Sequence, residues 1–225
     1  MIDLVLVTWP NHPARLAYFG DCVNLLTKHL TASRHEIRWL CSAESQRDPA
    51  QPWQGEGLAE LCRERGIALH WREGKAGLGE NMNAALRLCT APLIFLVQDD
   101  FYLNEKLDLS PGADFMLEHV EVDLLRYSWP GDDRVTLVEC LDGFRRFDVQ
   151  GDWPYGDDPH MRRPDFMSRW GWYLERTVHG ASEGDMLHRL RRGRANIAAA
   201  DKLYFGHGGA VTAVINDLRK RNVPR

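Results

Sequence analysis

Strand and helix patterns alternate through the first hundred residues, and this alternation restricts the fold more than any other feature. Short runs rich in β-branched and apolar residues, at 2–8, 36–42, 67–71 and 93–97, are typical of β-strands. Between them, apolar residues recur at the three- and four-residue spacing of amphipathic helices, most clearly at 16–30. Strand–helix repeats with short links favour right-handed crossovers and a parallel sheet flanked by helices.

Local signals place the ends of these elements. Pro13 suits the first turn of the first helix, and Gly66 is placed to cap the C-terminus of a second helix. The stretch 47–57 contains several Pro and Gly residues and is predicted to be a loop. A third helix is predicted around 82–89, just before the strand at 93–97.

The pattern changes after residue 101. A segment at 153–175 is rich in aromatic residues and Arg, and a helical pattern covers 183–192, before a predicted amphipathic C-terminal helix. The strand patterns in this part fall at 124–129, 135–140, 144–149 and 202–207. A chain of 225 residues fits one domain with a sizeable core, so we expect a single α/β domain over residues 1–225.

Composition indicates an ordinary soluble globular protein. The chain is 44% hydrophobic and 27% charged, and its longest apolar run is far too short to span a bilayer. Five widely spaced cysteines contain no C-x-x-C pair, which argues for a reducing compartment and against a zinc knuckle or a disulfide framework. The first residues include Asp3 and show no basic leader, so we expect a cytoplasmic protein.

Charge is distributed unevenly along the chain. Residues 161–225 carry 13 Lys and Arg against 6 Asp and Glu, a balance of +7, whereas residues 1–160 carry 15 against 26, a balance of −11. A basic third on an acidic body suggests a site for ligands that carry phosphate. Solvated surface charge explains the same asymmetry equally well.

The run LIFLVQDDF ends on two adjacent carboxylates, Asp99 and Asp100. In parallel sheets, ligands bind outside the carboxyl ends of the strands, where residues 8–10 and 42–44 are also expected. Carboxylates are the hard oxygen ligands that Mg²⁺ and Mn²⁺ prefer. Two solvated acids at a strand end are the structural alternative to a cation site.

The stretch KAGLGENMNAALRLCTAPLIFLVQDD resembles the core of family 2 glycosyltransferases of the GT-A fold. Gly77, Asn83 and Ala85 fall on the family pattern, and the spacing from Asn83 to Asp100 matches the spacing to the second Asp of the family's D-x-D motif. The resemblance thus implies that Asp100 is a metal ligand, and that Gly77 and Asn83 belong to the nucleotide-sugar site.

The chain departs from the family pattern at two positions. Lys75 replaces the usual Asn, and Gln98 replaces the first Asp of D-x-D. A neutral amide binds a dication less strongly than a carboxylate does, so Gln98 is expected to hydrogen-bond ribose or sugar. Asp99 is expected to take over part of the lost role.

A second resemblance lies at GASEGDMLHRL, which is similar to the family's E-D-x-D-L-x-x-R helix start. In this register Glu183 is the catalytic acid, Asp185 the later acid and Arg189 the Arg, while Ser182 replaces the first Glu. A carboxylate in the first turn of a helix suits the general base of an inverting transfer. The alternative is a helix cap made by Ser182 and the two acids.

Weaker matches complete the expected site. His207, in YFGHGG, occupies the position of a late family His that completes the metal site or contacts the diphosphate. Arg189, Trp170 and Trp172 are assigned to the acceptor. Of Trp170 and Trp172, which resemble the family's aromatic–Gly segment, we expect one to point outward and one inward. Thr8, Pro10 and Glu44 match positions that contact the nucleoside.

The resemblance implies a GT-A-like, mixed but mostly parallel sheet, with residues 1–101 binding the nucleotide sugar and residues 102–225 shaping the acceptor and catalytic site. It implies a Mn²⁺- or Mg²⁺-dependent, inverting transfer of sugar to an acceptor hydroxyl, with a UDP-sugar favoured as donor.

The acceptor stays open between a saccharide and hydroxymethylated DNA. Arg189, Arg191, Arg192 and Arg194 would suit the DNA, whereas a saccharide does not require them. One alternative function is a sugar-phosphate nucleotidylyltransferase, although TWPNHP lacks the Gly-rich loop usual in those enzymes. The other is a non-catalytic nucleotide- or sugar-binding module.

Overall fold

A nine-stranded sheet forms the centre of the computed structural model, which describes residues 1–10, 13–44, 55–72, 77–127, 137–151, 154–177 and 181–207. Its strand order is β4-β3-β1-β5-β11-β8-β12-β10-β9. The bounds are β1 (Ile2–Thr8), β3 (Ile37–Glu44), β4 (Ala68–Arg72), β5 (Leu93–Gln98), β8 (Leu124–Arg126), β9 (Leu137–Leu141), β10 (Phe144–Phe147), β11 (His160–Arg162) and β12 (Ile197–Ala199). Within this described sheet only β10 and β11 run against the other seven strands.

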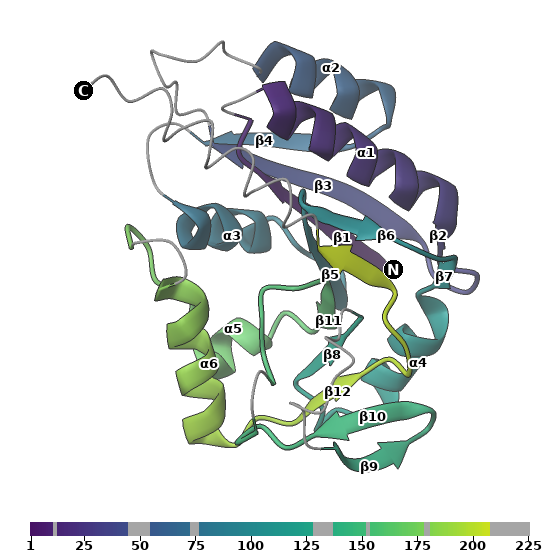
Figure 1. Ribbon diagram of the computed structural model, residues 1–225, viewed down its shortest axis with the longest axis vertical. Helices are drawn as coiled ribbons and strands as arrows, with labels where there is room; N and C mark the ends of the chain where they lie inside the picture. The colour runs from purple at the N-terminus through teal and green to yellow at the C-terminus, as the bar shows by residue number, and fades with distance from the viewer. Residues whose placement is uncertain are drawn as a thin grey trace.

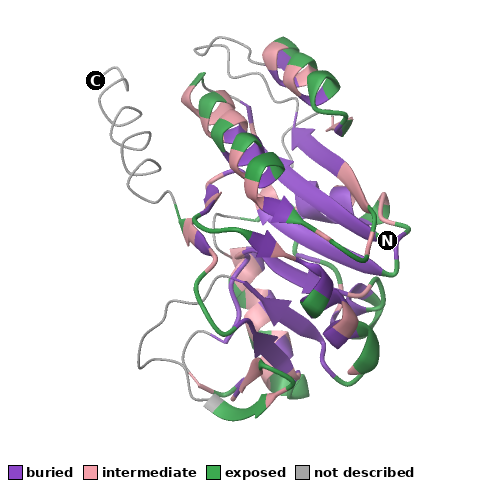
Figure 2. Ribbon diagram, turned by 90° about the vertical axis from the view of Figure 1, so that its right-hand side faces the viewer, coloured by how far each residue is buried: buried purple, intermediate pink, exposed green. Residues whose placement is uncertain are grey.

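Helices cover both faces of the sheet (Figure 1). The first face packs against α1 (Pro13–His29), α2 (Gly55–Glu64) and α4 (Ser110–Glu118), and the second against α3 (Leu78–Arg87), α5 (Phe166–Trp170) and α6 (Ala181–Gly193). Side chains of β1 alternate between the two cores, with Leu4 and Leu6 in the first and Val5 and Val7 in the second. Figure 2 shows the buried strands between helices whose outer sides are exposed.

Two short strand pairs tie distant segments together. β2 (Leu30–Thr31) pairs in parallel with β7 (Leu107–Asp108), and β6 (Phe101–Leu103) pairs antiparallel with β13 (Phe205–His207). The second pair matters for function, because it places His207 opposite Phe101, directly beside the acid pair.

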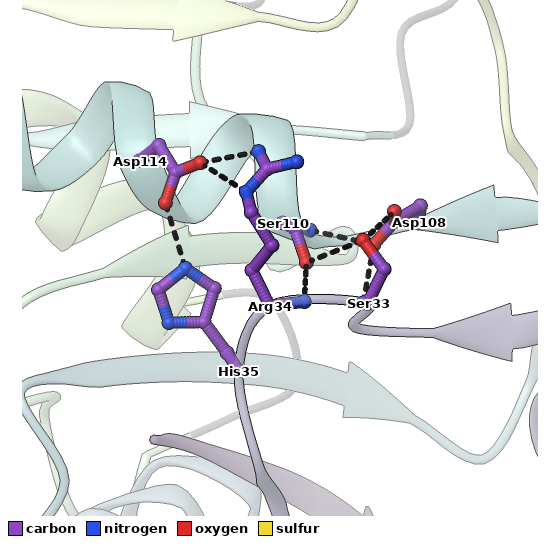
Figure 3. A network of polar contacts seen from close by, with 6 residues as sticks. All are labelled: Ser33, Arg34, His35, Asp108, Ser110 and Asp114. Atoms are coloured by element: carbon purple, nitrogen blue, oxygen red, sulfur yellow. Dashed lines mark hydrogen bonds and ion pairs between the residues drawn. The ribbon is translucent and has the colours of Figure 1, made fainter.

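A polar network fixes the turn after β2 against the start of α4. Figure 3 shows its six residues, Ser33, Arg34, His35, Asp108, Ser110 and Asp114. Burial raises the pKa of Asp108, but hydrogen bonds from Ser33 and Ser110 outweigh it and lower that pKa to about 2. Asp114 accepts hydrogen bonds from Arg34 Nε (2.9 Å) and pairs with His35 Nε2 (2.7 Å).

The predicted alternation of the first hundred residues is confirmed. α1 begins at Pro13, and α2 is followed by Gly66 in the left-handed region (φ 66°). The N–H of Ile67 donates to the carbonyl of Cys62 at 2.8 Å, which closes that helix end. The loop prediction for 47–57 is wrong at its end, because α2 already begins at Gly55.

The second half differs more from expectation. The strands β8, β9, β10 and β13 overlap the predicted strands at 124–129, 135–140, 144–149 and 202–207, of which residues 128–129 and 135–136 lie outside the described residues. Patterns in the sequence did not reveal α4, β11 or β12. Lys75 and the predicted C-terminal helix lie outside the described residues. In the described part of the chain, no helix combines the length and apolar character that a membrane crossing requires.

Candidate functional site

The carboxyl ends of β1, β5 and β8 meet at one rim of the sheet, and the reversed strand β11 begins there. Thr8, Gln98, Arg126 and His160 therefore share this rim. The backbone N–H of Asp99 donates to the carbonyl of Val7 at 3.2 Å, which places the acid pair at the end of β1. The convergence of strand ends predicted from the sequence is confirmed.

Asp99 is the inward member of the acid pair. Its side chain is 2% exposed, accepts a hydrogen bond from Thr8 Oγ1 at 2.6 Å and lies 3.2 Å from Arg15 Nη1. Burial raises the pKa of Asp99 to about 6, against the opposing effect of Arg15. Both of its oxygens are engaged within the protein, so Asp99 holds Arg15 and Thr8 in place at the rim. The predicted contact of Asp99 with a ligand stays a prediction.

Asp100 is the member of the acid pair with a carboxylate oxygen that has no hydrogen-bond partner among the described residues. Its Oδ2 lies 3.6 Å from Arg15 Nη1 and 3.6 Å from His207 Nε2, while its Oδ1 makes no hydrogen bond within the described chain. Burial raises the pKa of Asp100, but His207 and Arg15 outweigh it and hold that pKa below its ordinary value. In turn, Asp100 raises the pKa of His207, whose side chain is 52% exposed.

The structure thus brings together the two predicted metal ligands. Asp100 and His207 are distant in sequence, but their side chains form one ion pair. No cluster of three or more His, Cys, Asp or Glu side chains suited to a metal occurs among the residues the structure describes. Mg²⁺ and Mn²⁺ often take only one or two protein ligands and fill the rest with phosphate and water. The unpaired Oδ1 of Asp100 and the imidazole beside it fit such a partial site.

Glu183 lies in the first turn of α6, and hydrogen bonds through the turn that carries Asp157 link it to Gln98 at the end of β5. Its Oε1 accepts a hydrogen bond from the backbone N–H of Asp157 at 3.3 Å. The carbonyl of Asp157 in turn accepts a hydrogen bond from Gln98 Nε2 at 3.0 Å. Gly156 permits this approach, since a Cβ there would stand 3.2 Å from Glu183 Oε1. The predicted base and the acid-pair strand are therefore linked through Asp157, and ligand binding by Gln98 stays a prediction.

Behind this turn lies a buried polar cluster that the sequence motifs missed. Asp157 Oδ1 accepts a hydrogen bond from the Tyr155 hydroxyl at 2.7 Å, and the Tyr155 and Tyr173 hydroxyls are also 2.7 Å apart. Arg162 Nη1 donates to the Tyr173 hydroxyl at 3.2 Å. The adjacent acids in YGDDPH, set in an apolar and aromatic stretch, were the signal that could have identified this region.

Arg15 is a second functional candidate that sequence reasoning missed. It lies in the first turn of α1, directly after β1, and its guanidinium faces both Asp99 and Asp100. In a strand–helix unit, the N-terminus of the helix lies at the same rim as the end of the strand. A basic residue at this position was therefore a usable signal for a group facing a rim ligand.

Asn83 and Gly77 shape the start and inner face of α3. Asn83 is fully buried, and its Nδ2 donates to the carbonyl of Tyr173 and to Glu175 Oε1, each at 2.9 Å. Its Oδ1 accepts from the N–H of Tyr173 at 3.0 Å. Gly77 precedes α3 with φ 82°, a conformation that favours glycine. The amide of Asn83 fixes the segment after α5, and its predicted contact with the donor stays a prediction.

The two Trp residues point in opposite directions, as expected. Trp170 is 8% exposed and its Nε1 donates to Asp123 at 3.1 Å, whereas Trp172 is 42% exposed and stacks on Arg87, 4.7 Å from the ring centroid. Arg189 donates to the carbonyls of both Trp residues. It therefore holds the turn that presents Trp172.

The remaining predicted residues divide by location. Pro10 and Glu44 are buried near the ends of β1 and β3. Arg191 donates to the carbonyls of Val149 (3.3 Å) and Gly151 (2.6 Å), so part of the basic cluster anchors a loop. Arg192 and Arg194, by contrast, are exposed.

Comparison with solved structures identifies the fold. S. aureus TarS in complex with UDP-GlcNAc matches with a TM-score of 0.62 and 16% identity, over 91% of this chain and 57% of TarS. TarS in complex with UDP matches with a TM-score of 0.60 and 17% identity, over 91% of this chain and 59% of that one. A CMP:2-keto-3-deoxy-manno-octonic acid synthetase complexed with CTP matches with a TM-score of 0.56 and 10% identity, over 99% of both chains.

The chain has the GT-A-like, mixed α/β fold that the sequence resemblance implied. It spans somewhat more than half the length of the TarS structures. No family model and no curated protein sequence matches it. The resemblance to family 2 glycosyltransferases accordingly rests on the sequence motifs alone.

Proposed function

We propose that the protein is a nucleotide-sugar-dependent glycosyltransferase that transfers sugar to an acceptor hydroxyl with inversion. One observation carries the proposal: Asp100, just past the end of β5, pairs with His207 of β13, and Gln98 of β5 is linked through Asp157 to Glu183. A group that can neutralise phosphate and a group that can accept a proton are thereby held around one rim. The neighbours crystallised with UDP-GlcNAc and UDP support a nucleotide-sugar donor.

Donor binding is assigned to the rim of β1, β3, β5 and α3. Asp100 and His207 would hold Mn²⁺ or Mg²⁺, which when bound supplies positive charge to the departing diphosphate. The other donor-site residues in this proposal are Thr8, Pro10, Glu44, Lys75, Gly77, Asn83, Gln98 and Asp99. Arg15, which is paired with both acids, adds a fixed positive charge beside the phosphates.

Glu183 is assigned the role of general base. Its carboxylate takes the proton of the acceptor hydroxyl while that oxygen forms a bond to the anomeric carbon. The bond from the anomeric carbon to the diphosphate oxygen breaks on the opposite face, and its electrons leave with the nucleoside diphosphate. One displacement inverts the anomeric configuration, and the proton ends on Glu183.

The acceptor side is assigned to the exposed side chain of Trp172 and to the exposed arginines at the end of α6. A flat indole surface stacks on sugar rings or on bases. Arg192 and Arg194 are exposed and would suit a polyanionic acceptor such as hydroxymethylated DNA, whereas a saccharide would rely on Trp172. Trp170 and Arg189 support this surface from behind.

A hydrolysis screen tests the proposal without knowledge of the acceptor. The protein is incubated with a panel of nucleotide sugars and Mn²⁺, Mg²⁺ or chelator, and release of nucleoside diphosphate is measured. We expect release from one or a few donors, dependent on metal and reduced by Asp100→Ala. Release that is unchanged in excess chelator contradicts the metal assignment, and no release from any donor contradicts the transferase.

A second candidate is a sugar-phosphate nucleotidylyltransferase. The end-to-end match to the synthetase complexed with CTP, over 99% of both chains, favours it. Such an enzyme would join a nucleoside triphosphate to an acidic sugar or sugar phosphate and release pyrophosphate. Pyrophosphate release from CTP or UTP in the presence of sugar substrates, with no nucleotide-sugar hydrolysis, would identify this activity instead.

A further inference from the structure

A second acidic residue, Asp157, lies next to the proposed base. The Asp157 N–H donates to Glu183 Oε1 at 3.3 Å, and the Asp157 side chain is only 6% exposed. A Cβ on the neighbouring Gly156 would lie 3.2 Å from Glu183 Oε1 and 3.1 Å from Asp158 Oδ2, so both carboxylates approach this glycine. The Glu183 carboxylate thus rests against the turn that carries Asp157.

Both hydrogen-bond donors and other acids surround Asp157. The Tyr155 hydroxyl donates to its Oδ1 at 2.7 Å, and Tyr173 and Arg162 continue this chain of hydrogen bonds into the core. Arg162 is fully buried, and its Nε and Nη2 make no hydrogen bond within the described chain. The charged and titratable groups around Asp157 are Tyr155 and Asp158 on its own turn, Arg162 on β11, Tyr173 after α5, and Glu183 on α6.

Burial and the neighbouring acids raise the pKa of Asp157 by more than the neighbouring donors lower it. Burial and the charge of Glu183 raise the pKa of Asp157 to about 7, despite the hydrogen bond from Tyr155 and the charge of Arg162. Two carboxyl groups that interact this closely lose their protons in two separate steps. Asp157 is therefore neutral below the upper step and negative above it, and the negative form raises the proton affinity of its neighbour.

We propose that Asp157 is a positioning residue for Glu183. Its backbone holds the Glu183 carboxylate at the rim, and its own carboxylate, when charged, makes Glu183 a stronger base toward the acceptor hydroxyl. This inference rests on the proposed transferase and adds a second acid to its catalytic site. It also gives a reason for the burial of Asp157 and Arg162 beside the apolar side chains of the second core.

The test is the pH dependence of turnover for a donor that the wild type hydrolyses. A stronger base works faster, so we expect the wild-type kcat to rise about 3- to 10-fold through the upper ionisation. In Asp157→Asn the backbone contacts and the acceptor for Tyr155 remain, while the charge is lost. We expect this variant to show no rise and an unchanged KM for the donor. A persisting rise, or a changed KM with the wild-type pH profile, overturns the inference.

A second variant keeps the Asp157 carboxyl group. Tyr155→Phe removes the O–H that stabilises its charged form, so the rise should move to higher pH. A rise caused by another group, such as His207, would stay where it is in this variant. That result would overturn the assignment to Asp157 even if Asp157→Asn failed to fold.

Infrared difference spectra provide a readout that does not depend on turnover. Burial raises the pKa of Asp99 to about 6, so its C=O band also changes with pH, in the wild type and in Asp157→Asn alike. Between about pH 6 and pH 8, the wild type should lose an additional C=O band of a protonated carboxyl group, and Asp157→Asn should lack this additional change. Identical changes in the two proteins overturn the inference, whatever the kinetics. Absence of turnover with every donor overturns the proposed function itself, and with it the role of Glu183, so the two failures are distinguishable.

Discussion

Replacement of Glu183 by Gln removes a proton acceptor and leaves the surrounding structure in place. The amide oxygen of Gln can still accept the N–H of Asp157, which now lies 3.3 Å from Glu183 Oε1. Loss of a negative charge from the first turn of α6 costs about 0.3–1 kcal/mol through the helix dipole. The lost repulsion with Asp157 opposes this cost, so the free energy of unfolding should change by less than about 1 kcal/mol.

The effect on catalysis should be much larger. A positioned general base contributes about 10²–10⁴-fold, which corresponds to about 2.7–5.4 kcal/mol of transition-state stabilisation. Glu183→Gln should therefore lower kcat by this factor in a continuous assay of nucleoside diphosphate release. The KM for the donor should stay near the wild-type value, because Glu183 belongs to the acceptor side.

Asp185→Asn is the matched control, two residues further along the same helix. Asp185 pairs with Arg189 at 2.6 Å, and both side chains are partly exposed, so the pair is worth only about 0.3–0.5 kcal/mol. Arg189 also keeps its bonds to the carbonyls of Trp170 and Trp172. Turnover should remain within a few-fold of wild type. If the Gln variant is active and Asp185→Asn is dead, the base is Asp185 and our motif register is wrong.

Three further variants test other parts of the site. Asp100→Ala should abolish metal-dependent donor binding in calorimetric titrations with Mn²⁺ while the melting temperature stays close to wild type; undiminished binding would contradict its role as ligand. Asn83→Ala leaves the buried N–H and C=O of Tyr173 unpaired and should lower the free energy of unfolding by about 2–4 kcal/mol in urea titrations, a loss that a merely exposed amide would not produce. If DNA is the acceptor, replacing Arg191, Arg192 and Arg194 by Ala should weaken DNA binding and flatten its salt dependence; no DNA affinity at low salt favours a saccharide.

The first half of the fold was predictable because its signals are local. The apolar run of β5 and the repeating apolar face of α1 each specify an element without help from distant residues. The position of Asp100 and Glu183 also followed from local motifs. Their link through Asp157 did not, because it joins residues that are distant in sequence.

The missed elements depend on contacts that no local pattern records. β11 contains only three residues, and two of them, His160 and Arg162, are polar but buried. His160 forms a hydrogen bond with the carbonyl of Asp158, and Arg162 donates to the Tyr173 hydroxyl, which lies beyond α5 in the chain. α4 begins with Ser-Pro-Gly, a sequence that is typical of a turn. Pro is tolerated in a first turn, and Gly112 is needed there because a Cβ would collide with the Tyr127 hydroxyl.

The place of β11 in the sheet has a consequence for folding and for protein engineering. β11 comes late in the chain, yet it pairs with β5 on one side and β8 on the other. A fragment ending at residue 101 would keep every strand from β1 to β5 but would leave β5 as an unprotected edge. The exposed backbone of its apolar run Leu93–Gln98 would then be free to pair with other chains. Residues 1–101 should thus aggregate when expressed alone, and transplanting them into another protein requires residues 160–162 as well.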